Sequence, residues 1–246
     1  MSKKIHSSIV YSFYDAKNNK RQIYLSFKKN ESFEIEGDLK SAAFSPDGSQ
    51  AVYFVNKPNG GELLISKGVN IIKRALKTRL DAAIVNWPVN FISLLSYDKD
   101  GYGDLFILKD GGELNKILSS QRDLNVKWSP SGEKIVFSVK DTNGSENLFY
   151  KDVKSNGAII ALNVSTTASK CVWAYEDDII CGVKNQAQLK DEFYKINLAD
   201  KSKTLVATPS TNLLTKELAL SRLGDTLFIL NDLDSILYAL KIKEPQ

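Results

Sequence analysis

The chain has 246 residues, of which 43% are hydrophobic and 25% are charged, and Lys and Arg outnumber Asp and Glu by 33 to 29. This composition is typical of a globular protein and is far less basic than that of a dense nucleic-acid-binding surface. The sequence contains no run of about 18 apolar residues, the length that spans a bilayer, so we expect no membrane insertion by this segment.

The start of the chain, MSKKIHSSIVYSFYDAKNNK, has two adjacent lysines but lacks the apolar core of a signal peptide. Either the protein is cytoplasmic or a targeting segment precedes this chain. His6 is the only histidine, and its place ahead of the first expected strand makes it a poor triad member. One histidine and two cysteines cannot readily supply the four ligands of a zinc site. These counts disfavour most hydrolase and metalloenzyme classes.

One β-hairpin recurs along the chain. Its best copy, FSPDGSQAVYF at 44–54, places a Pro-Asp-Gly turn between two alternating segments. Further copies are WPVNFISLLSY at 87–97, WSPSGEKIVF at 128–137, WAYEDDIICGV at 173–183 and LSRLGDTLFIL at 220–230. The first residues of the copies, which we expect to pack between blades, are Phe44, Trp87, Trp128, Trp173 and Leu220, at spacings of 43, 41, 45 and 47 residues. Such a period, with strand and turn content only, is typical of the four-stranded blades of a β-propeller.

A second hairpin follows each of these markers, and another, SIVYSFYDAKNNKRQIYLSF, precedes the first marker. Short outer strands are expected at SFEIEG, NIIKRA, LNKIL, AIIALNV and KTLVATP. The total is 22 strands, so the first blade lacks its inner strand and the last blade lacks its outer strand. We favour an all-β propeller of six blades of antiparallel strands, in a single domain over 1–246 that is part of a longer natural chain. The alternative is five blades, with the N-terminal hairpin packed outside.

The SPDG and WSPSG hairpins carry a family resemblance. Each is followed by an aromatic strand and by a strand such as GDLFIL or NLFYKD, and in this they resemble the WD-repeat-like propellers of the TolB type over about residues 8–243. The segment KCVWAYEDDIICGV also resembles a blade of bacterial envelope-associated propellers of unknown function. The TolB-type resemblance implies a protein-binding propeller, often outside the cytoplasm, and it carries over no catalytic residues.

The sharpest local motif is YDKDGYGDLFIL at 97–108. Its three acids, Asp98, Asp100 and Asp104, bracket two glycines, as in Asp-rich loops that bind calcium. The motif lacks the late bidentate Glu of an EF-hand and lies between two expected strands. The alternative is a hairpin turn in which Asp and Gly stabilise only the backbone. Calcium is the one cofactor that the sequence suggests.

A basic stretch, NIIKRALKTRLDAA at 70–83, contains Lys73, Arg74, Lys77 and Arg79. Such a strip can contact phosphates, but it has no interleaved aromatic residues on which bases could stack. A solvated outer strand whose charges discourage edge pairing is the alternative. We expect no nucleic-acid binding.

The two cysteines lie on opposite strands of one hairpin, CVWAYEDDIIC. Facing residues of an antiparallel pair have a constant index sum, so the register that pairs Trp173 with Ile179 also pairs Cys171 with Cys181. We expect a Cys171–Cys181 disulfide, and with it an exported, envelope-facing domain, periplasmic or extracellular, whose targeting segment is absent from this chain. The alternative is a pair of reduced core thiols in a cytoplasmic protein.

No compact catalytic constellation is visible, so the leading hypothesis is a non-catalytic interaction module. It is a monomeric domain that presents its loops and central channel to a protein or peptide partner. The alternative is a carbohydrate-active hydrolase that uses two channel carboxylates from different blades. A third hypothesis is an architectural domain of a larger surface protein.

Overall fold

The computed structural model describes residues 9–15, 20–28, 31–35, 38–67, 70–187 and 190–242. These residues form 22 strands and one short 3-10 helix, η1 (Ala168–Lys170). Among them, no helix has both the length and the apolar character needed to cross a membrane. The chain divides into two compact units, an N-terminal unit up to Ser120 and a C-terminal unit from Gln121 onward. The expectation of a single domain stays a prediction.

The first three antiparallel sheets are each built from consecutive strands. The first sheet contains β1 (Ile9–Asp15), β2 (Lys20–Lys28) and β3 (Glu31–Glu34). The second contains β4 (Asp38–Phe44), β5 (Gln50–Lys57), β6 (Gly60–Lys67) and β7 (Asn70–Thr78). The third contains β8 (Ile84–Asn86), β9 (Ile92–Tyr97), β10 (Tyr102–Leu108) and β11 (Leu114–Arg122).

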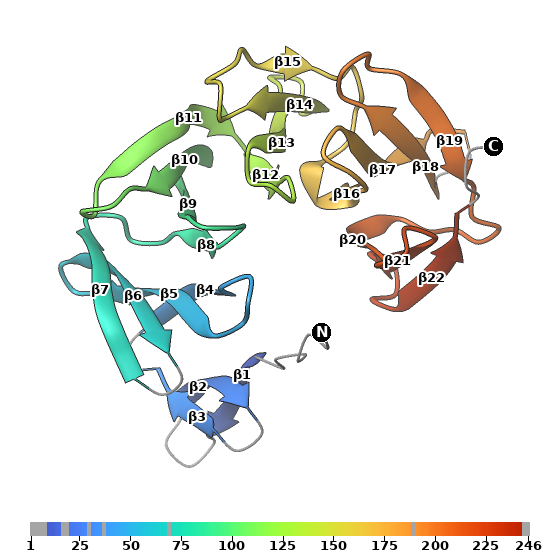
Figure 1. Cartoon of the computed structure of the whole chain (residues 1–246). Coiled ribbons are helices and arrows are strands. Elements are labelled where there is room, and N and C mark those ends of the chain that lie inside the picture. The colour runs from blue at the N-terminus through green and yellow to red at the C-terminus, as the bar shows by residue number, and fades with distance from the viewer. Residues whose placement is uncertain are drawn as a thin grey trace. The chain divides into compact units, whose positions relative to one another are not determined.

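Three further sheets make up the C-terminal unit, where they follow one another in chain order (Figure 1). The first contains β12 (Asn125–Trp128), β13 (Lys134–Lys140), β14 (Glu146–Asp152) and β15 (Ile160–Ala161). The next contains β16 (Cys171–Trp173), β17 (Asp178–Asn185), β18 (Lys190–Asn197) and β19 (Lys203–Ala207). The last contains β20 (Thr215–Leu220), β21 (Thr226–Asn231) and β22 (Leu237–Lys241).

The described part of the chain therefore holds six sheets, four of them four-stranded, with three strands in the first and in the last. This is the expected pattern of six antiparallel blades with incomplete first and last members, and the predicted all-β fold class is confirmed. One predicted outer strand is shorter than expected, because β15 spans only Ile160–Ala161 and Asn163 then adopts a left-handed backbone with a φ of 54°, although Leu162 and Val164 still form backbone hydrogen bonds with Leu148. L-residues adopt this conformation mainly in turns.

The repeated hairpin has one geometry in three of its copies, those at 44–54, 128–137 and 220–230. A serine hydroxyl accepts the backbone N–H five residues later, and the serine carbonyl accepts the N–H of a glycine three residues later. The serines are Ser45, Ser129 and Ser221, and the glycines, whose φ values are 69°, 73° and 76°, are Gly48, Gly132 and Gly224. Glycine adopts these positive φ values without the steric cost that a Cβ atom would add. The sequence repeat thus has a physical basis in the turn.

Within each unit, apolar clusters pack between neighbouring sheets. The middle strands are buried on both faces, so they consist of nearly continuous apolar runs, as in β5 and β13. One cluster joins residues of β5 to residues of β8 and β9, another joins β13 to β17, and a third joins β17 to β21. Each cluster holds one sheet against the next, as blades require.

The five repeat markers lie at the ends of inner strands or directly after them. All are half-buried, and they are Phe44, Trp87, Trp128, Trp173 and Leu220. Trp173 shows how a marker joins two sheets, because its indole Nε1 donates to the Lys127 carbonyl of β12 at 3.4 Å. Trp87 packs against the cluster that the second and third sheets share. These two contacts lie between neighbouring sheets, and the packing role of the five markers as a set stays a prediction.

Candidate functional site

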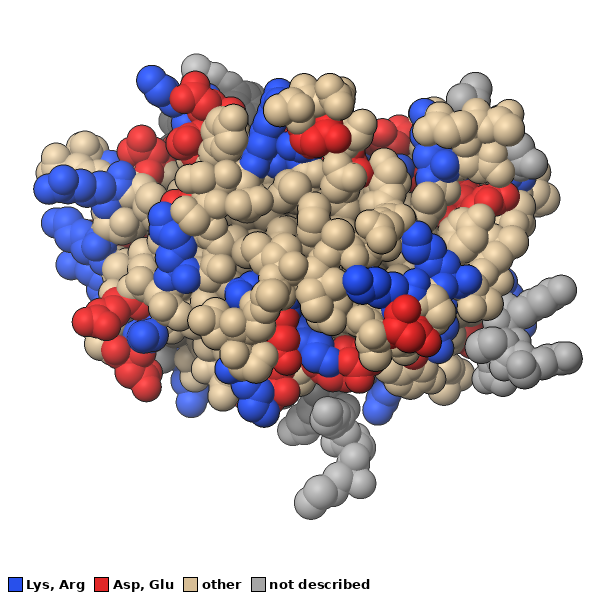
Figure 2. Space-filling model, turned by 90° about the horizontal axis from the view of Figure 1, so that it is seen from above, with Lys and Arg blue, Asp and Glu red and all other residues tan. Residues whose placement is uncertain are grey.

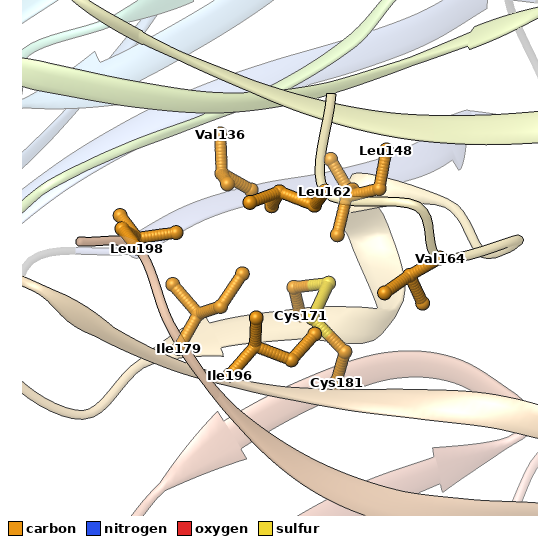
Figure 3. Close-up of a cluster of buried hydrophobic side chains, with 10 residues drawn as sticks. Val136, Leu148, Leu162, Val164, Cys171, Ile179, Cys181, Ile196 and Leu198 are labelled. Atoms are coloured by element: carbon orange, nitrogen blue, oxygen red, sulfur yellow. A yellow bond between two sulfur atoms is a disulfide. The ribbon is translucent and has the colours of Figure 1, made fainter. Parts of the chain in front are cut away.

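Cys171 and Cys181 form a disulfide in the C-terminal unit. They face each other in the β16–β17 pair, in the same register that pairs Trp173 with Ile179, and their Cα atoms are 4.1 Å apart. Both side chains are fully buried. Figure 3 shows the bridge inside an apolar cluster that includes Val164 and Ile196. The predicted pairing is confirmed, and its burial makes the bridge a structural one.

Two of the three acids of the calcium hypothesis, Asp98 and Asp104, bind separate partners through their carboxylates. The Asp98 carboxylate accepts the N–H groups of Asp100 and Tyr102, each at 2.9 Å, in the turn between β9 and β10. Asp104 instead accepts Lys116 Nζ at 2.7 Å and the Ser120 N–H at 2.7 Å. Burial acts to raise the pKa of Asp104, but these hydrogen bonds outweigh it and lower the pKa. Across the described residues, no group of three His, Cys, Asp or Glu side chains is placed to hold a metal ion.

The basic stretch lies on β7 and just beyond it, at an outer edge of the second sheet. The side chains that it exposes to solvent belong to Lys73, Arg74, Lys77 and Arg79. Arg74 Nε lies 3.5 Å from a carboxylate oxygen of Glu62 on β6, so part of this charge is balanced locally. On the face drawn in Figure 2, basic side chains are interspersed with acidic ones. His6 lies outside the described residues.

A pocket of about 360 Å³ lies in the C-terminal unit, between the loop after β15 and the sheet β16–β19. Its volume falls within the range of small-molecule and peptide side-chain sites. The lining comes from the 163–165 loop, from β17 and β18, and from Lys203 on β19. Val164, Val183 and Ile196 give it an apolar floor, and Val164 and Ile196 belong to the cluster that surrounds the disulfide. The bridge therefore stabilises the wall on which the pocket is built.

A fixed carboxylate lies at one end of the pocket. Glu192 Oε1 accepts Asn185 Nδ2 at 3.0 Å, and Glu192 Oε2 accepts the Tyr194 hydroxyl at 2.8 Å. The hydrogen bonds from Asn185 and Tyr194 lower the pKa of Glu192, and the same bond raises the pKa of Tyr194. At neutral pH the pocket thus presents an ionised carboxylate beside a neutral phenol.

A fixed ammonium group lies at the other end. Lys203 Nζ donates to the Asn163 carbonyl at 2.6 Å, which ties β19 to the loop after β15. Lys203 pairs with Ile196 across β18 and β19, and Ile196 is four residues beyond Glu192 on β18. At about 3.3 Å of rise per residue, the two charged ends are roughly 13 Å apart along the strand.

A second polar cluster joins the β16–β19 sheet to the β20–β22 sheet. Its centre is Asp191, which is fully buried and accepts Lys170 Nζ at 3.1 Å and the Thr215 N–H at 2.6 Å. Lys170 belongs to η1 and Thr215 begins β20. Asp191 therefore links three elements, and its enclosed position indicates a structural role.

Comparison with known proteins places the fold. No protein-family model and no curated protein matches the sequence. Among solved structures, the β-propeller domain of the Trilobed protease from Pyrococcus furiosus is similar over 97% of this chain and 78% of its own, with a TM-score of 0.67 and 11% identity. TolB from Acinetobacter baumannii is similar over 80% of this chain and 50% of its own, with a TM-score of 0.55 and 14% identity.

The fold is a TolB-type β-propeller. A third similar structure is the acylaminoacyl peptidase from Pyrococcus horikoshii, with a TM-score of 0.63 and 16% identity over 97% of this chain and 44% of its own. This chain thus spans about half the length of TolB and less than half of the peptidase. At these identities the likeness concerns the fold alone, and propellers host many different functions.

The sequence patterns did not single out the residues that line the pocket. Glu192 and Tyr194 share one face of β18, whereas the alternate positions Asp191 and Phe193 are buried on the other face. This alternation in KDEFYKIN is a readable signal of a two-sided strand. The partners Asn163 and Lys203 are 40 residues apart and meet only through the fold.

Proposed function

We propose that the chain is a non-catalytic interaction module that binds a peptide segment of a protein partner. The observation that carries this proposal is the pocket of the C-terminal unit, with its apolar floor and two fixed charges of opposite sign. A few positioned polar groups around an apolar surface are what a binding site needs for affinity and orientation. The TolB-type resemblance, which implies protein binding, supports the same function.

The electrostatics of the pocket favour binding over catalysis. A general acid or base works best with a pKa near the working pH. The hydrogen bonds from Asn185 and Tyr194 instead lower the pKa of Glu192 below its ordinary value of 4.5, further from neutral pH. The carboxylate is therefore ionised at neutral pH and is a weak base, which suits a fixed anion that orients a ligand.

We also propose that the domain functions in an exported, envelope-facing setting. Disulfides persist in oxidising compartments and are rare in the cytosol. The buried Cys171–Cys181 bridge supports this location. The proposal predicts that protein isolated from its native cells under thiol-blocking conditions contains no free thiol, whereas two free thiols in the denatured, unreduced protein would contradict it.

The function is tested by selection against the immobilised protein from a display library of random peptides. The same protein is assayed with chromogenic glycosides and with peptide amides. We expect enriched peptides that bind at about micromolar Kd and no turnover of either substrate class. Turnover that disappears when a described carboxylate is neutralised would support the hydrolase alternative instead, and failure to enrich any peptide would contradict the proposal.

A further inference from the structure

We propose that the pocket binds an extended peptide segment whose alternate residues are basic, apolar and acidic, with the basic side chain at Glu192 and the acidic one at Lys203. The inference rests on the proposed function and adds the chemistry of the ligand. It follows from three properties of the pocket, namely its two charged ends, its apolar floor and its length along β18.

The first property is the unused hydrogen-bonding capacity at both ends. An ionised carboxylate offers about four lone-pair positions, and with the described residues Glu192 uses two of them, on Asn185 and Tyr194. An ammonium group has three N–H donors, and among the described residues Lys203 uses one of them, on the Asn163 carbonyl. Each end is thus held in place by the protein and still has room for a ligand of opposite charge.

The second property is the apolar floor between the two ends. Val164, Val183 and Ile196 form it, and the ring of Tyr194 lies between Glu192 and Ile196 along β18. Burying an apolar side chain here removes its surface from water, which contributes about 25 cal/mol per Å². A leucine-sized side chain at the centre of the segment therefore provides affinity, and the charged ends set its orientation.

The third property is the length of the pocket. Glu192, Tyr194 and Ile196 are alternate residues of one strand, so their side chains point to the same face. An extended peptide has the same alternation and the same rise of about 3.3 Å per residue. Its first, third and fifth side chains therefore meet the carboxylate, the floor and the ammonium group in turn, over the roughly 13 Å that separate the charged ends.

The test uses fluorescein-labelled peptides with blocked ends and fluorescence anisotropy. The matched probe is Lys-Ser-Leu-Ser-Asp, and the mismatched probes are Lys-Ser-Leu-Ser-Lys and Asp-Ser-Leu-Ser-Asp. We expect the unmodified protein to bind the matched probe about tenfold more tightly than either mismatched one, because like charges at one end of a site oppose binding. Equal binding of the three probes would overturn the inference.

Variants with a reversed charge at Glu192 or Lys203 show whether these two residues determine the peptide preference. We expect Glu192→Lys to prefer the probe with two acids and Lys203→Glu to prefer the probe with two lysines, each by about tenfold. The control is Lys216→Glu, which makes the same change of net charge as Lys203→Glu at an exposed residue of β20 outside the pocket lining and should keep the original preference. Circular dichroism and thermal unfolding show whether each variant is folded, and the neutral variants Glu192→Gln and Lys203→Gln replace any that is not.

The possible results separate this inference from the proposed function. If peptides from the display library bind but the pocket variants bind them unchanged, the site and ligand chemistry assigned here are wrong and the proposed function stands. If neither the library nor the designed probes yield a binding peptide, the proposed function fails and the inference fails with it. A switch of preference that follows the pocket charges, with no switch in Lys216→Glu, supports both.

Discussion

Lys170 and Asp191 form one ion pair, but replacing Lys170 should lower the free energy of unfolding more than replacing Asp191 does. Asp191 is fully buried, whereas the Lys170 side chain keeps 23% of its surface exposed. In Lys170→Met, a carboxylate remains buried without its cation, which typically costs about 3–5 kcal/mol. In Asp191→Asn, the amide oxygen still accepts the Thr215 N–H and the lysine can turn toward water. We therefore expect the free energy of unfolding to fall by only about 1–2 kcal/mol.

Urea unfolding followed by circular dichroism measures this difference. With a slope of about 2 kcal/mol per molar urea, the two variants should differ in midpoint by roughly 1 M. In the double variant, the decrease in the free energy of unfolding should be smaller than the sum of the two single decreases by at least about 1 kcal/mol, because the partners are in contact. The control Lys216→Met breaks an exposed pair with Asp232 that is 4.0 Å long, and its effect should stay below about 0.5 kcal/mol. Equal losses in the two single variants would refute the burial argument.

Three further predictions concern the disulfide, a turn and the pocket. Reducing the Cys171–Cys181 bridge, whose cysteines are 10 residues apart, should lower the free energy of unfolding by about 2–3 kcal/mol, measured by urea unfolding with and without reductant. Hydrogen bonds from Ser45 and Ser49 lower the pKa of Asp47 to about 2, so its NMR titration midpoint should lie there and move toward the ordinary value of 3.8 in Ser45→Ala. Because the pKa of Glu192 is lowered from its ordinary value of 4.5, its contribution to peptide binding should fall to half only in buffer more acidic than pH 4.5, measured by anisotropy.

The blades could be predicted from the sequence because the residues that define each hairpin are close together in the chain. A Ser-Pro-Asp-Gly turn, a glycine with positive φ and two alternating strands lie within about a dozen residues, and each determines the next. The same holds for the disulfide, because Cys171 and Cys181 belong to one hairpin and the index sum fixes their register.

The pocket could not be predicted in the same way. Its carboxylate, floor and ammonium group come from β17, β18, β19 and a loop of the preceding sheet. The polar alternation of β18 marks a two-sided strand, but it does not say that Asn163 lies opposite. The link from Asp191 to Thr215 is likewise non-local, since it spans 24 residues and two sheets. Contacts between blades depend on how the sheets pack, which strand patterns alone do not encode.

Hydrogen–deuterium exchange with a peptide from the unbiased display selection tests the central claim most directly. The claim is that this propeller binds a peptide segment along β18 in its C-terminal unit. We predict that the bound peptide slows exchange in 163–165 and in the segments that carry β17 and β18, and that Glu192→Lys removes this protection for a peptide with a basic residue. Protection confined to other parts of the chain, such as the turns at 45–49 and 129–133, would contradict the account.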